Sequence, residues 1–205
     1  MAREKSVKEA IMGIPLVYQL FQDGIRKPTS DVFVARDVIR GEDGMSILDV
    51  GCGVARIRKS LGNVNYVGID HNPRYISKAK KKHGDSGRFL VADVSEVSQL
   101  FHSKFDRVIL IGVLHHLNDA SSRDLVSEAS LHLKPGGHLV TYDPTFVPNQ
   151  HPISFLVSRF DRGRFVRTPE AYLKLFGAEF STLKLSVRHD LLRIPSATAI
   201  IVAKP

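Results

Sequence analysis

The feature that most constrains the fold of this chain is a repeated alternation of short apolar runs with segments that carry helix signals. Apolar runs of strand length occur at five places: 46–50, 66–69, 89–92, 108–111 and 138–142. Alternation of strands and helices favours right-handed crossover connections, which place the strands in one parallel sheet with helices on both faces. This part of the chain therefore predicts a doubly wound α/β fold.

The helix signals are clearest in two of the intervening segments. In the first, an Asn-Pro pair at the start and Gly84 at the end predict a helix over 73–83. In the second, Asn118 is suited to an N-cap, and apolar residues recur at helical spacing until the turn sequence KPGG at 134–137. We therefore predict helices in both segments.

The alternation changes towards the end of the sequence. A helix predicted over 169–177 leads to two longer strands, within 179–190 and over 198–204, with a turn near 194–196. Two such strands form an antiparallel hairpin, either at the edge of the sheet or inserted in it. The complete prediction is an α/β, Rossmann-like, doubly wound and mostly parallel seven-stranded sheet with a C-terminal antiparallel hairpin.

Composition and charge limit the classes of function. At 205 residues, with 43% hydrophobic and 24% charged residues, the chain fits one globular domain. It lacks the apolar core of a signal peptide and any run long enough to span a membrane, so we expect a cytoplasmic protein. Cys52 is the only cysteine, which excludes an internal disulfide and a cysteine-based metal cluster. The net charge of +8 favours anionic partners, either a metabolite or a nucleic acid.

Acidic and histidine side chains follow the predicted strands at the points where the strands end. These residues are Asp49, Asp70, Asp93, His115, His116 and Asp143. In open parallel sheets, ligands bind at the carboxyl ends of the strands. We therefore expect a binding site at this edge of the sheet.

The segment ILDVGCGVAR at 47–56 has an acid followed by two glycines. Gly51 and Gly53 allow a sharp turn after the first strand and let a ligand approach the backbone without meeting a Cβ atom. We expect a following helix to offer free amide groups at its N-terminus. The same glycines would also suit a tight turn that binds nothing, so this motif alone does not identify a ligand.

The second strand makes the ligand prediction more specific. Asp70 lies 21 residues after Asp49 and ends its strand, where a carboxylate accepts both hydroxyls of a ribose in nucleotide-binding sheets. A nucleoside ligand is therefore implied. Arg56 stands where a dinucleotide-binding fold has its third glycine, which disfavours a dehydrogenase.

Four segments together resemble the class I S-adenosylmethionine-dependent methyltransferases, and more narrowly their small type 11 and type 12 members. The segments are LDVGCGVA at 48–55, FLVADV at 89–94, FDRVILIGVLHHL at 105–117 and LKPGGHLVTYDP at 133–144. Ala55 replaces the third glycine of the first motif, which is a mild departure from the family. The resemblance covers about 45–144 and implies S-adenosyl-L-methionine as the cofactor.

By this resemblance, the loop after the first strand holds the methionine part of the cofactor. Gly51 and Gly53 pass beneath it, and Cys52 lies between them in the same loop. Asp49 orients the amino group of the cofactor, so its negative charge meets a positive one.

The nucleoside part is held, by the same resemblance, at the ends of the next two strands. Asp70 holds the ribose and His71 lies beside the adenine. Asp93 accepts a hydrogen bond from the adenine amino group, and Val94 donates one from its backbone.

The reaction needs little further chemistry, because a methyl sulfonium is already a strong electrophile. The chain has to place the acceptor in line and remove its proton where necessary. The resemblance places Ile111 and Gly112 beside the sulfonium. His115 and His116 are candidate bases, since histidine titrates nearest to neutral pH, and Asp143 is a second candidate base or substrate contact. The alternatives are a histidine that packs as a structural hydrogen-bonding residue and an aspartate that serves only a turn.

The segment 144–168 is too long for a bare connection, so we predict an insertion that lies over the acceptor pocket. Within it, His151, Arg159, Arg162 and Arg164 are candidate substrate-binding residues. Guanidinium groups bind phosphate or carboxylate, so an acidic or phosphorylated acceptor is predicted. A solvated loop with ordinary ion pairs is the alternative.

The sequence therefore predicts a methyltransferase that acts on an oxygen atom of a small molecule. An RNA methyltransferase and a catalytically inactive binding protein of the same fold are the alternatives. No metal is predicted, because the residues after the fourth strand do not resemble a ligand cluster. We predict one domain with four parts: a helical N-terminal cover at 1–44, a cofactor-binding core at 45–143, a substrate-side insertion at 144–168, and a C-terminal helix and antiparallel hairpin at 169–205.

Overall fold

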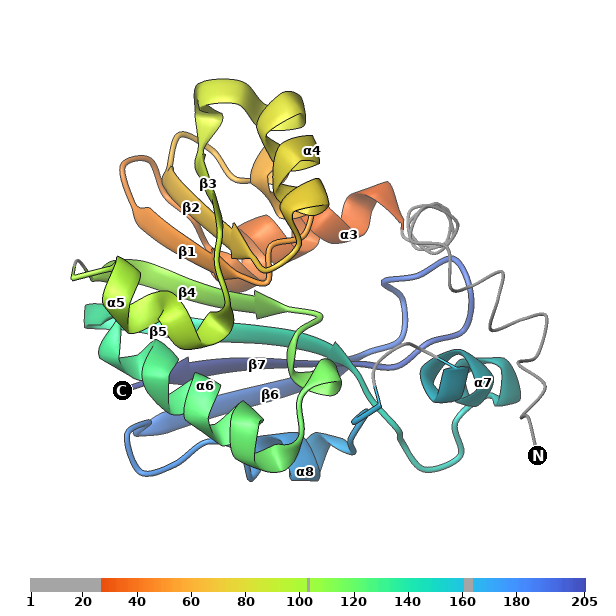
Figure 1. Ribbon diagram of the computed structural model, residues 1–205. Helices are drawn as coiled ribbons and strands as arrows, with labels where there is room; N and C mark the ends of the chain where they lie inside the picture. Colours follow the sequence, from red (N-terminus) through yellow and green to blue (C-terminus); the bar gives the residue numbers. More distant parts are fainter. Residues whose placement is uncertain (1–26, 103, 161–163) are drawn as a thin grey trace, which may run out of the picture.

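The computed structural model describes residues 27–102, 104–160 and 164–205, which form one central sheet with helices around it (Figure 1). The strands of this part of the chain lie in the order β3-β2-β1-β4-β5-β7-β6. Their bounds are β1 Ser46–Val50, β2 Asn65–Asp70, β3 Arg88–Val91, β4 Phe105–Ile111, β5 Leu133–Pro144, β6 Thr182–Arg188 and β7 Thr198–Lys204. The predicted seven-stranded α/β sheet is confirmed.

The first five strands are parallel, and β7 is antiparallel to both of its neighbours, β5 and β6. The C-terminal hairpin is therefore inserted in the sheet: β7 lies between β5 and β6, and β6 is the outermost strand. This order makes β6 run in the same direction as β5. Pro144 at the end of β5 pairs with Thr198, which in turn pairs with Arg188 at the end of β6. The loop between β6 and β7 consequently lies at the same edge as the carboxyl ends of the parallel strands.

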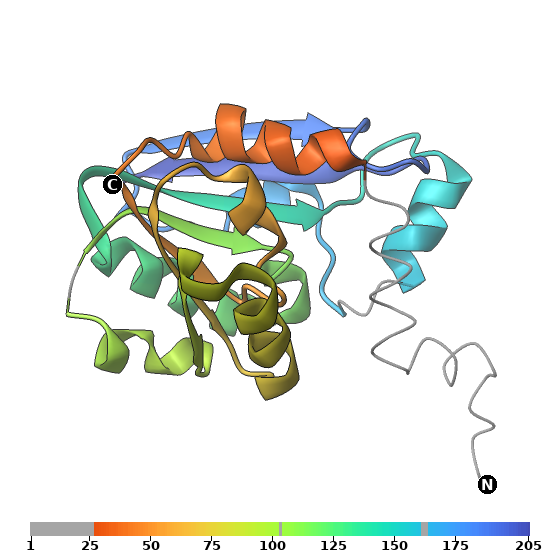
Figure 2. The ribbon, with the colours of Figure 1, turned by 90° about the horizontal axis from the view of Figure 1, so that it is seen from above.

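Helical segments lie on both faces of the sheet, as Figure 2 shows for α3 on one face and α6 on the other. The longer segments are α3 Pro28–Phe33, the π-helix η1 Val34–Ile39, α4 Pro73–His83, α6 Asp119–Leu131, α7 Pro152–Phe160 and α8 Pro169–Leu173. The shorter ones are α5 Val97–Leu100 and the 3₁₀ segments η2 Arg56–Ser60, η3 Gly84–Ser86, η4 Val94–Glu96 and η5 Leu114–His116.

Buried apolar residues form two clusters, which follow the alternation of side chains along the strands. Ile47 of β1 belongs to the cluster that contains α3, η1 and α4 residues such as Ile76. Leu48, its neighbour, belongs to the cluster that contains α6 residues such as Leu125. Each fully buried aliphatic side chain stabilises the fold by about 1.5 to 3 kcal/mol. Asp49 shares a face with Ile47, so its side chain enters the first cluster beside Tyr66.

The two helices with the clearest sequence signals have the expected starts. The bounds of α4 are those predicted, and Asn72 Oδ1 accepts a hydrogen bond from Arg74 N at 3.0 Å. The Asn118 Oδ1 atom caps α6 in the same way, accepting from Ser121 N at 2.9 Å. Local capping therefore explains both helix boundaries.

Two boundaries differ from the sequence predictions. The KPGG segment was predicted as a turn but is part of β5, because Leu133 already pairs with Phe105 and a register shift accommodates the segment. The helix predicted over 169–177 ends at Leu173. Beyond that residue the chain continues in tighter turns, in which Leu175 N donates to Tyr172 O.

The predicted N-terminal cover is only partly described. Residues 27–44 contain α3 and η1, whereas the rest of the predicted cover, 1–26, lies outside the described residues. The division of the chain into four parts stays a prediction. Among the helices of the described ranges, none has the length and apolar character required to cross a membrane.

Candidate functional site

Asp49 on β1 is a buried acid with one unpaired oxygen. The phenol of Tyr66 on β2 donates a hydrogen bond to Asp49 Oδ2, while Oδ1 has no hydrogen-bond partner among the described residues. Burial raises the pKa of Asp49 to about 7, which the Tyr66 hydrogen bond partly offsets and the charge of Asp70 reinforces. A buried carboxylate of this kind is costly when ionised and is suited to a cationic ligand.

The loop after β1 has two glycines that serve different purposes. Gly51 has a φ of +74°, and a Cβ atom there would lie 2.7 Å from Val113 Cγ2, so packing requires a glycine. Gly53 has a φ of +56°, but a Cβ atom there would meet nothing within 4 Å. The backbone N–H groups of Gly51 and Cys52 both donate to Ile69 O at 2.9 Å. The loop is thus held against β2 and leaves open space above Gly53.

The segment after this loop corrects one expectation. The sequence predicted a helix whose N-terminus would offer free amides, but the segment is the five-residue 3₁₀ helix η2, preceded by Ala55 with a φ of +52°. Arg58 Nη1 donates to Leu61 O at 2.9 Å and to Gly62 O at 3.1 Å, which closes the segment into a turn. The helix after the loop is therefore shorter and tighter than an α-helix, and a ligand contact at its N-terminus stays a prediction.

Asp70 at the end of β2 is oriented by the backbone. Its Oδ2 atom accepts a hydrogen bond from Gly53 N at 2.9 Å, and its Oδ1 atom accepts one from Asn72 N at 2.8 Å. Each carboxylate oxygen has a further lone pair, so these bonds fix the side chain without saturating it. The next residue, His71, has 81% of its side chain exposed, and its Nδ1 atom lies 3.7 Å from Asp70 Oδ1.

Asp93 follows β3 and is exposed at the same edge. Its Oδ1 atom accepts hydrogen bonds from Ser95 N at 3.0 Å and Ser95 Oγ at 2.8 Å. The backbone bond from Ser95 makes the largest contribution to lowering the pKa of Asp93. Val94 begins η4, directly after this acid.

Cys52 lies inside the loop with its thiol turned towards the sheet. A Cβ atom on Gly68 of β2 would lie 2.8 Å from Cys52 Sγ. Burial, followed by the charges of Asp49 and Asp70, raises the pKa of the Cys52 thiol. The thiol is therefore protonated, and the part of Cys52 that faces the loop is its backbone.

The structure brings two of the candidate bases together in one buried pair. His115 Nδ1 lies 2.7 Å from Asp143 Oδ1, and the backbone N–H of His115 donates to the same oxygen at 3.2 Å. The two side chains are 6% and 2% exposed, respectively. Burial raises the pKa of Asp143, although the hydrogen bond and charge of His115 oppose this effect. This geometry favours the structural alternative for His115.

The other residues of this loop lie nearer the surface. His116 is exposed, and its ring centroid lies 4.0 Å from that of His115. Ile111 and Gly112 are half-buried, and Gly112 N donates to Tyr142 O at 2.7 Å. A Cβ atom on Gly112 would lie 3.6 Å from His115 Cε1, so the glycine passes over the histidine ring.

Arg167 joins the insertion to the loop after β4. Its guanidinium donates to Leu114 O at 2.8 Å, to Leu117 O at 2.7 Å and to Phe165 O at 2.9 Å. It also forms an ion pair with Asp119, in which Arg167 Nη2 lies 2.8 Å from Asp119 Oδ1. Arg167 is 8% exposed, so it holds these segments together and does not present its charge to a ligand.

Of the four predicted substrate-binding residues, His151 and Arg164 have side chains that the structure describes. His151 precedes α7 and accepts a hydrogen bond at Nδ1 from Ile153 N at 3.1 Å. Arg159 is a residue of α7, Arg164 is exposed beyond it, and Arg162 lies outside the described residues. His151 lines the pocket described next.

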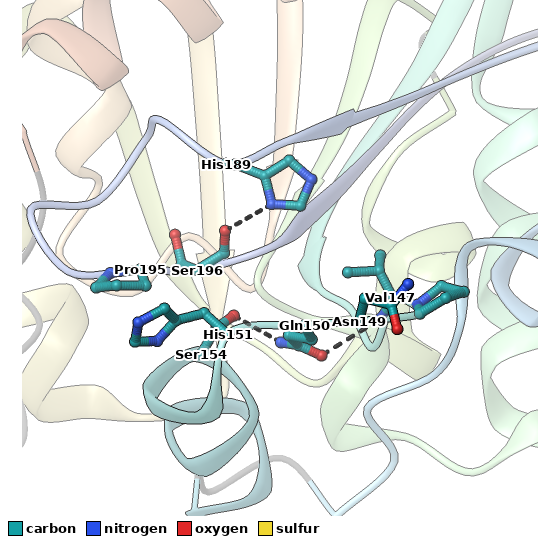
Figure 3. Close-up of a pocket in the computed structure, with 9 residues that line it drawn as sticks. Val147, Asn149, Gln150, His151, Ser154, His189, Pro195 and Ser196 are labelled. Carbon is teal, nitrogen blue, oxygen red and sulfur yellow. Dashed lines mark hydrogen bonds between the residues drawn. The ribbon is translucent and has the colours of Figure 1, made fainter.

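A pocket of about 360 Å³ lies between the start of α7 and the loop that joins β6 to β7 (Figure 3). It is lined by Val147, Pro148, Asn149, Gln150, His151, Ser154, His189, Pro195 and Ser196. Among the described residues, this lining contains no lysine, arginine, aspartate or glutamate. Val147, one of the lining residues, follows Asp143 by four residues, so the pocket lies near the end of β5.

Sequence reasoning missed His189 and Ser196, which come from the β6–β7 loop. Part of the signal was present in the sequence, since the hairpin was predicted with a turn near 194–196, but the first strand was predicted within 179–190 and ends before His189 in the structure. The sequence left open whether the hairpin is inserted in the sheet. Because β7 lies between β5 and β6, the loop that joins β6 to β7 lies at the carboxyl ends of the parallel strands.

No group of three or more metal-ligating side chains occurs within the ranges that the structure describes.

Comparison with known proteins identifies the domain. Residues 47–137 match the family model described as a methyltransferase domain. The plantazolicin methyltransferase BamL, solved with S-adenosylhomocysteine, superposes with a TM-score of 0.67 at 14% identity, covering 96% of this chain and 93% of that chain. Residues 47–137 thus match a methyltransferase domain, and the described residues have the fold of that solved methyltransferase.

The chain is similar to two further proteins. The mitomycin 7-O-methyltransferase MmcR superposes with a TM-score of 0.66 at 16% identity, covering 100% of this chain and 62% of that chain. The human protein named "Probable tRNA methyltransferase 9B" is 31% identical over 101 residues, which are 48% of this chain. The chain covers 21% of the length of that curated relative.

The residues at the edge of the methyltransferase domain fit S-adenosylmethionine. The cofactor has a cationic amino group, and Asp49 Oδ1 is a buried oxygen without a partner among the described residues. The space above Gly53, which a Cβ atom would enter freely, gives the cofactor access to the backbone. Asp70 is already oriented at the end of the neighbouring strand.

Proposed function

We propose that this chain transfers a methyl group from S-adenosylmethionine to an oxygen atom of a small acidic molecule. The observation that carries the cofactor part of the proposal is the unpaired Oδ1 of Asp49 beside the open backbone of Gly53. The cofactor supplies a methyl group on a positively charged sulfur atom.

The chain's residues bind the two halves of the cofactor from opposite sides of the glycine loop. Asp49, in its ionised form, pairs with the amino group, and Gly51, Cys52 and Gly53 pass beneath the methionine part. Asp70 accepts the ribose hydroxyls from an orientation that the backbone has already fixed. His71, Asp93 and Val94 hold the adenine, and Ile111 and Gly112 border the methyl group.

The acceptor side of the proposal rests on charge and on the pocket beside β5. The net charge of +8 attracts anions, and a volume of about 360 Å³ suits a small molecule. Arg159, Arg162 and Arg164 stay proposed contacts for an anionic group. An oxygen acceptor is consistent with the name of one structural neighbour, a 7-O-methyltransferase.

We propose three residues as candidates for the base that removes the acceptor proton. His115 and Asp143 form the buried pair, in which Asp143 orients the ring through Nδ1. His116 is the exposed member of the three. If His115→Asn and His116→Asn variants both retain full turnover, neither histidine is the base.

A methyl-transfer assay tests the proposal. Protein incubated with methyl-labelled S-adenosylmethionine and the small-molecule fraction of a cell extract should produce a labelled small molecule. Asp70→Asn should abolish transfer, because it removes a charge from the ribose contact. Asp106→Asn is the matched control: Asp106 also accepts a backbone amide, that of Ser46 at 2.8 Å, but lies at the opposite edge of the sheet.

A second candidate function is methylation of RNA. It is supported by the 31% identity to the human protein named as a probable tRNA methyltransferase and by the positive net charge. Titration with total tRNA at several salt concentrations separates the two candidates. Binding that weakens steeply with salt, together with label in the RNA fraction, would replace the small-molecule proposal with this one.

A further inference from the structure

The pocket between α7 and the β6–β7 loop contains two histidines whose proton positions are fixed by their backbone partners. The two walls come from segments about forty residues apart, 147–154 and 189–196. They are joined at their base, where Thr145 N donates to Ala197 O at 3.0 Å. The chemistry of this pocket is therefore set by residues outside the cofactor loop.

His189 offers a hydrogen-bond acceptor. Its Nδ1 atom lies 3.1 Å from Ser196 O, as the dashed line in Figure 3 indicates. A carbonyl oxygen can only accept, so Nδ1 carries the proton in this bond. In the neutral ring, Nε2 then has a free lone pair for a ligand.

His151, on the opposite wall, has the other tautomer. Its Nδ1 atom accepts a hydrogen bond from the backbone N–H of Ile153 at 3.1 Å. A backbone N–H can only donate, so Nδ1 is unprotonated and the proton of the neutral ring is on Nε2. His151 therefore offers a donor where His189 offers an acceptor.

Ser196 adds a polar group that lacks a partner. The residue is 7% exposed, and its hydroxyl has no hydrogen-bond partner in the described ranges. By contrast, Gln150 uses its side chain within the wall: Oε1 accepts from Val147 N at 3.2 Å, and Nε2 donates to Ser154 Oγ at 2.6 Å. A buried polar group without a partner indicates that an oxygen or nitrogen of a ligand, or a water molecule, completes the site.

We infer that this pocket binds the methyl acceptor, and that the acceptor is a small hydroxy acid with one negative charge. The inference rests on the proposed function. The acceptor hydroxyl donates to His189 Nε2, while a carboxylate or carbonyl oxygen accepts from His151 Nε2–H or from the Ser196 hydroxyl. A phosphorylated acceptor with two charges is disfavoured, because the part of the lining that the structure describes has no lysine or arginine.

The first test measures the tautomers without any ligand. Two-dimensional ¹H–¹⁵N spectra of the histidine rings distinguish a proton on Nδ1 from one on Nε2 in the neutral ring. We expect Nδ1–H for His189 and Nε2–H for His151. The opposite tautomer at either residue would overturn the assignment of donor and acceptor.

The second test measures binding of three hydroxy acids, namely 4-hydroxybenzoate, salicylate and lactate, by amide chemical shifts. At least one should bind with millimolar affinity and shift Val147, Ser154 and Ser196. Benzoate, which lacks the hydroxyl, and phenyl phosphate, which has a second charge, should bind at least fivefold more weakly. Absence of binding by all three acids, or tighter binding of phenyl phosphate, would contradict the inference.

Variants connect this binding to His189. His189→Phe, which removes the ring nitrogens, should weaken the bound acid at least fivefold, and His189→Gln should restore part of the loss. His102→Gln changes an exposed histidine before β4, at the opposite edge of the sheet, and should have no effect. Equal binding by wild type and His189→Phe would overturn the role of His189.

Titration with S-adenosylhomocysteine separates the two proposals. If that cofactor product binds but the hydroxy acids do not, the inference about the pocket fails alone. If the acids bind but the cofactor product does not, the proposed methyl transfer fails and the pocket remains a hydroxy-acid site.

Discussion

Two regions lie at the carboxyl ends of the parallel strands and are built in different ways. The first edge is the region beside β1, β2 and β3, and the second edge is the region beside β5, β6 and β7. In the first, residues between Asp49 and Asn72 supply the glycine loop, both of its acids and the hydrogen bonds that hold them. In the second, the pocket combines the insertion with a loop about forty residues later, and Arg167 links the insertion to the loop after β4. The first edge depends on local spacing, whereas the second depends on contacts between distant segments.

The largest expected effect in this comparison is a loss of stability when Arg167 is replaced. Arg167→Met should lower the free energy of unfolding by about 3 kcal/mol or more, because it removes three hydrogen bonds to carbonyl oxygens and the ion pair that a buried guanidinium forms with Asp119. Arg164→Met, at an exposed position of the same segment, should cost less than about 0.5 kcal/mol. Urea denaturation followed by circular dichroism measures both. Equal losses would mean that Arg167 does not hold the insertion in place.

The next effect is on cofactor affinity, at Gly53. Gly53→Ala puts a methyl group into the open space of the loop and should weaken S-adenosylhomocysteine about a hundredfold, equivalent to about 2.7 kcal/mol. The matched control is Gly136→Ala in β5, where φ is +76° and a Cβ atom also meets nothing within 4 Å. Both variants should lose about 1 to 2 kcal/mol of stability from the left-handed backbone, but only Gly53→Ala should lose affinity.

Calorimetric titration of these two variants decides the point. Similar affinities for Gly53→Ala and Gly136→Ala would place the cofactor away from the glycine loop.

A smaller effect is the pH dependence that Asp49 confers. Its pKa is raised from 3.8 to about 7 in the folded chain, so the folded state binds more protons than the unfolded state between these values. The stability of the free protein should therefore fall as pH rises from 4 to 7. Cofactor affinity should show the opposite trend, rising up to about tenfold per pH unit until pH 7, because the cationic amino group requires the ionised acid.

Asp49→Asn tests both trends at once. It should remove the fall in stability measured by thermal unfolding and flatten the rise in affinity measured by calorimetry. Tyr66→Phe should move the titration of Asp49 to higher pH, because the Tyr66 hydrogen bond opposes the effect of burial on the pKa of Asp49. A wild-type protein whose cofactor affinity does not change between pH 5.5 and 7 would contradict the pairing of Asp49 with the amino group.

The sequence predicted most of the first edge because its signals are local. The Asn-Pro pair and Gly84 define the bounds of α4, Asp49 is the last residue but one of β1, and Asp70 is the last residue of β2. The exception is η2, where a buried side chain, Arg58, closes the turn through carbonyls that no sequence pattern identifies.

The second edge was predicted only in outline because tertiary contacts decide it. His189 and Ser196 line the pocket because β7 pairs with β5, which makes β6 the outermost strand. Local sequence propensity does not determine which strand of the hairpin pairs with β5. His115 and Asp143 were predicted as separate candidates, and their pairing depends on the register of β4 and β5. The site roles of these residues stay predictions.

The most direct measurement of the central claim is a titration of the isotopically labelled protein with S-adenosylhomocysteine, followed by amide chemical shifts. We expect saturable shifts that are largest at Gly51, Gly53, Asp70 and Asp93. Saturable shifts confined to other parts of the chain, or no shift at millimolar ligand, would contradict a cofactor site at the carboxyl ends of β1, β2 and β3.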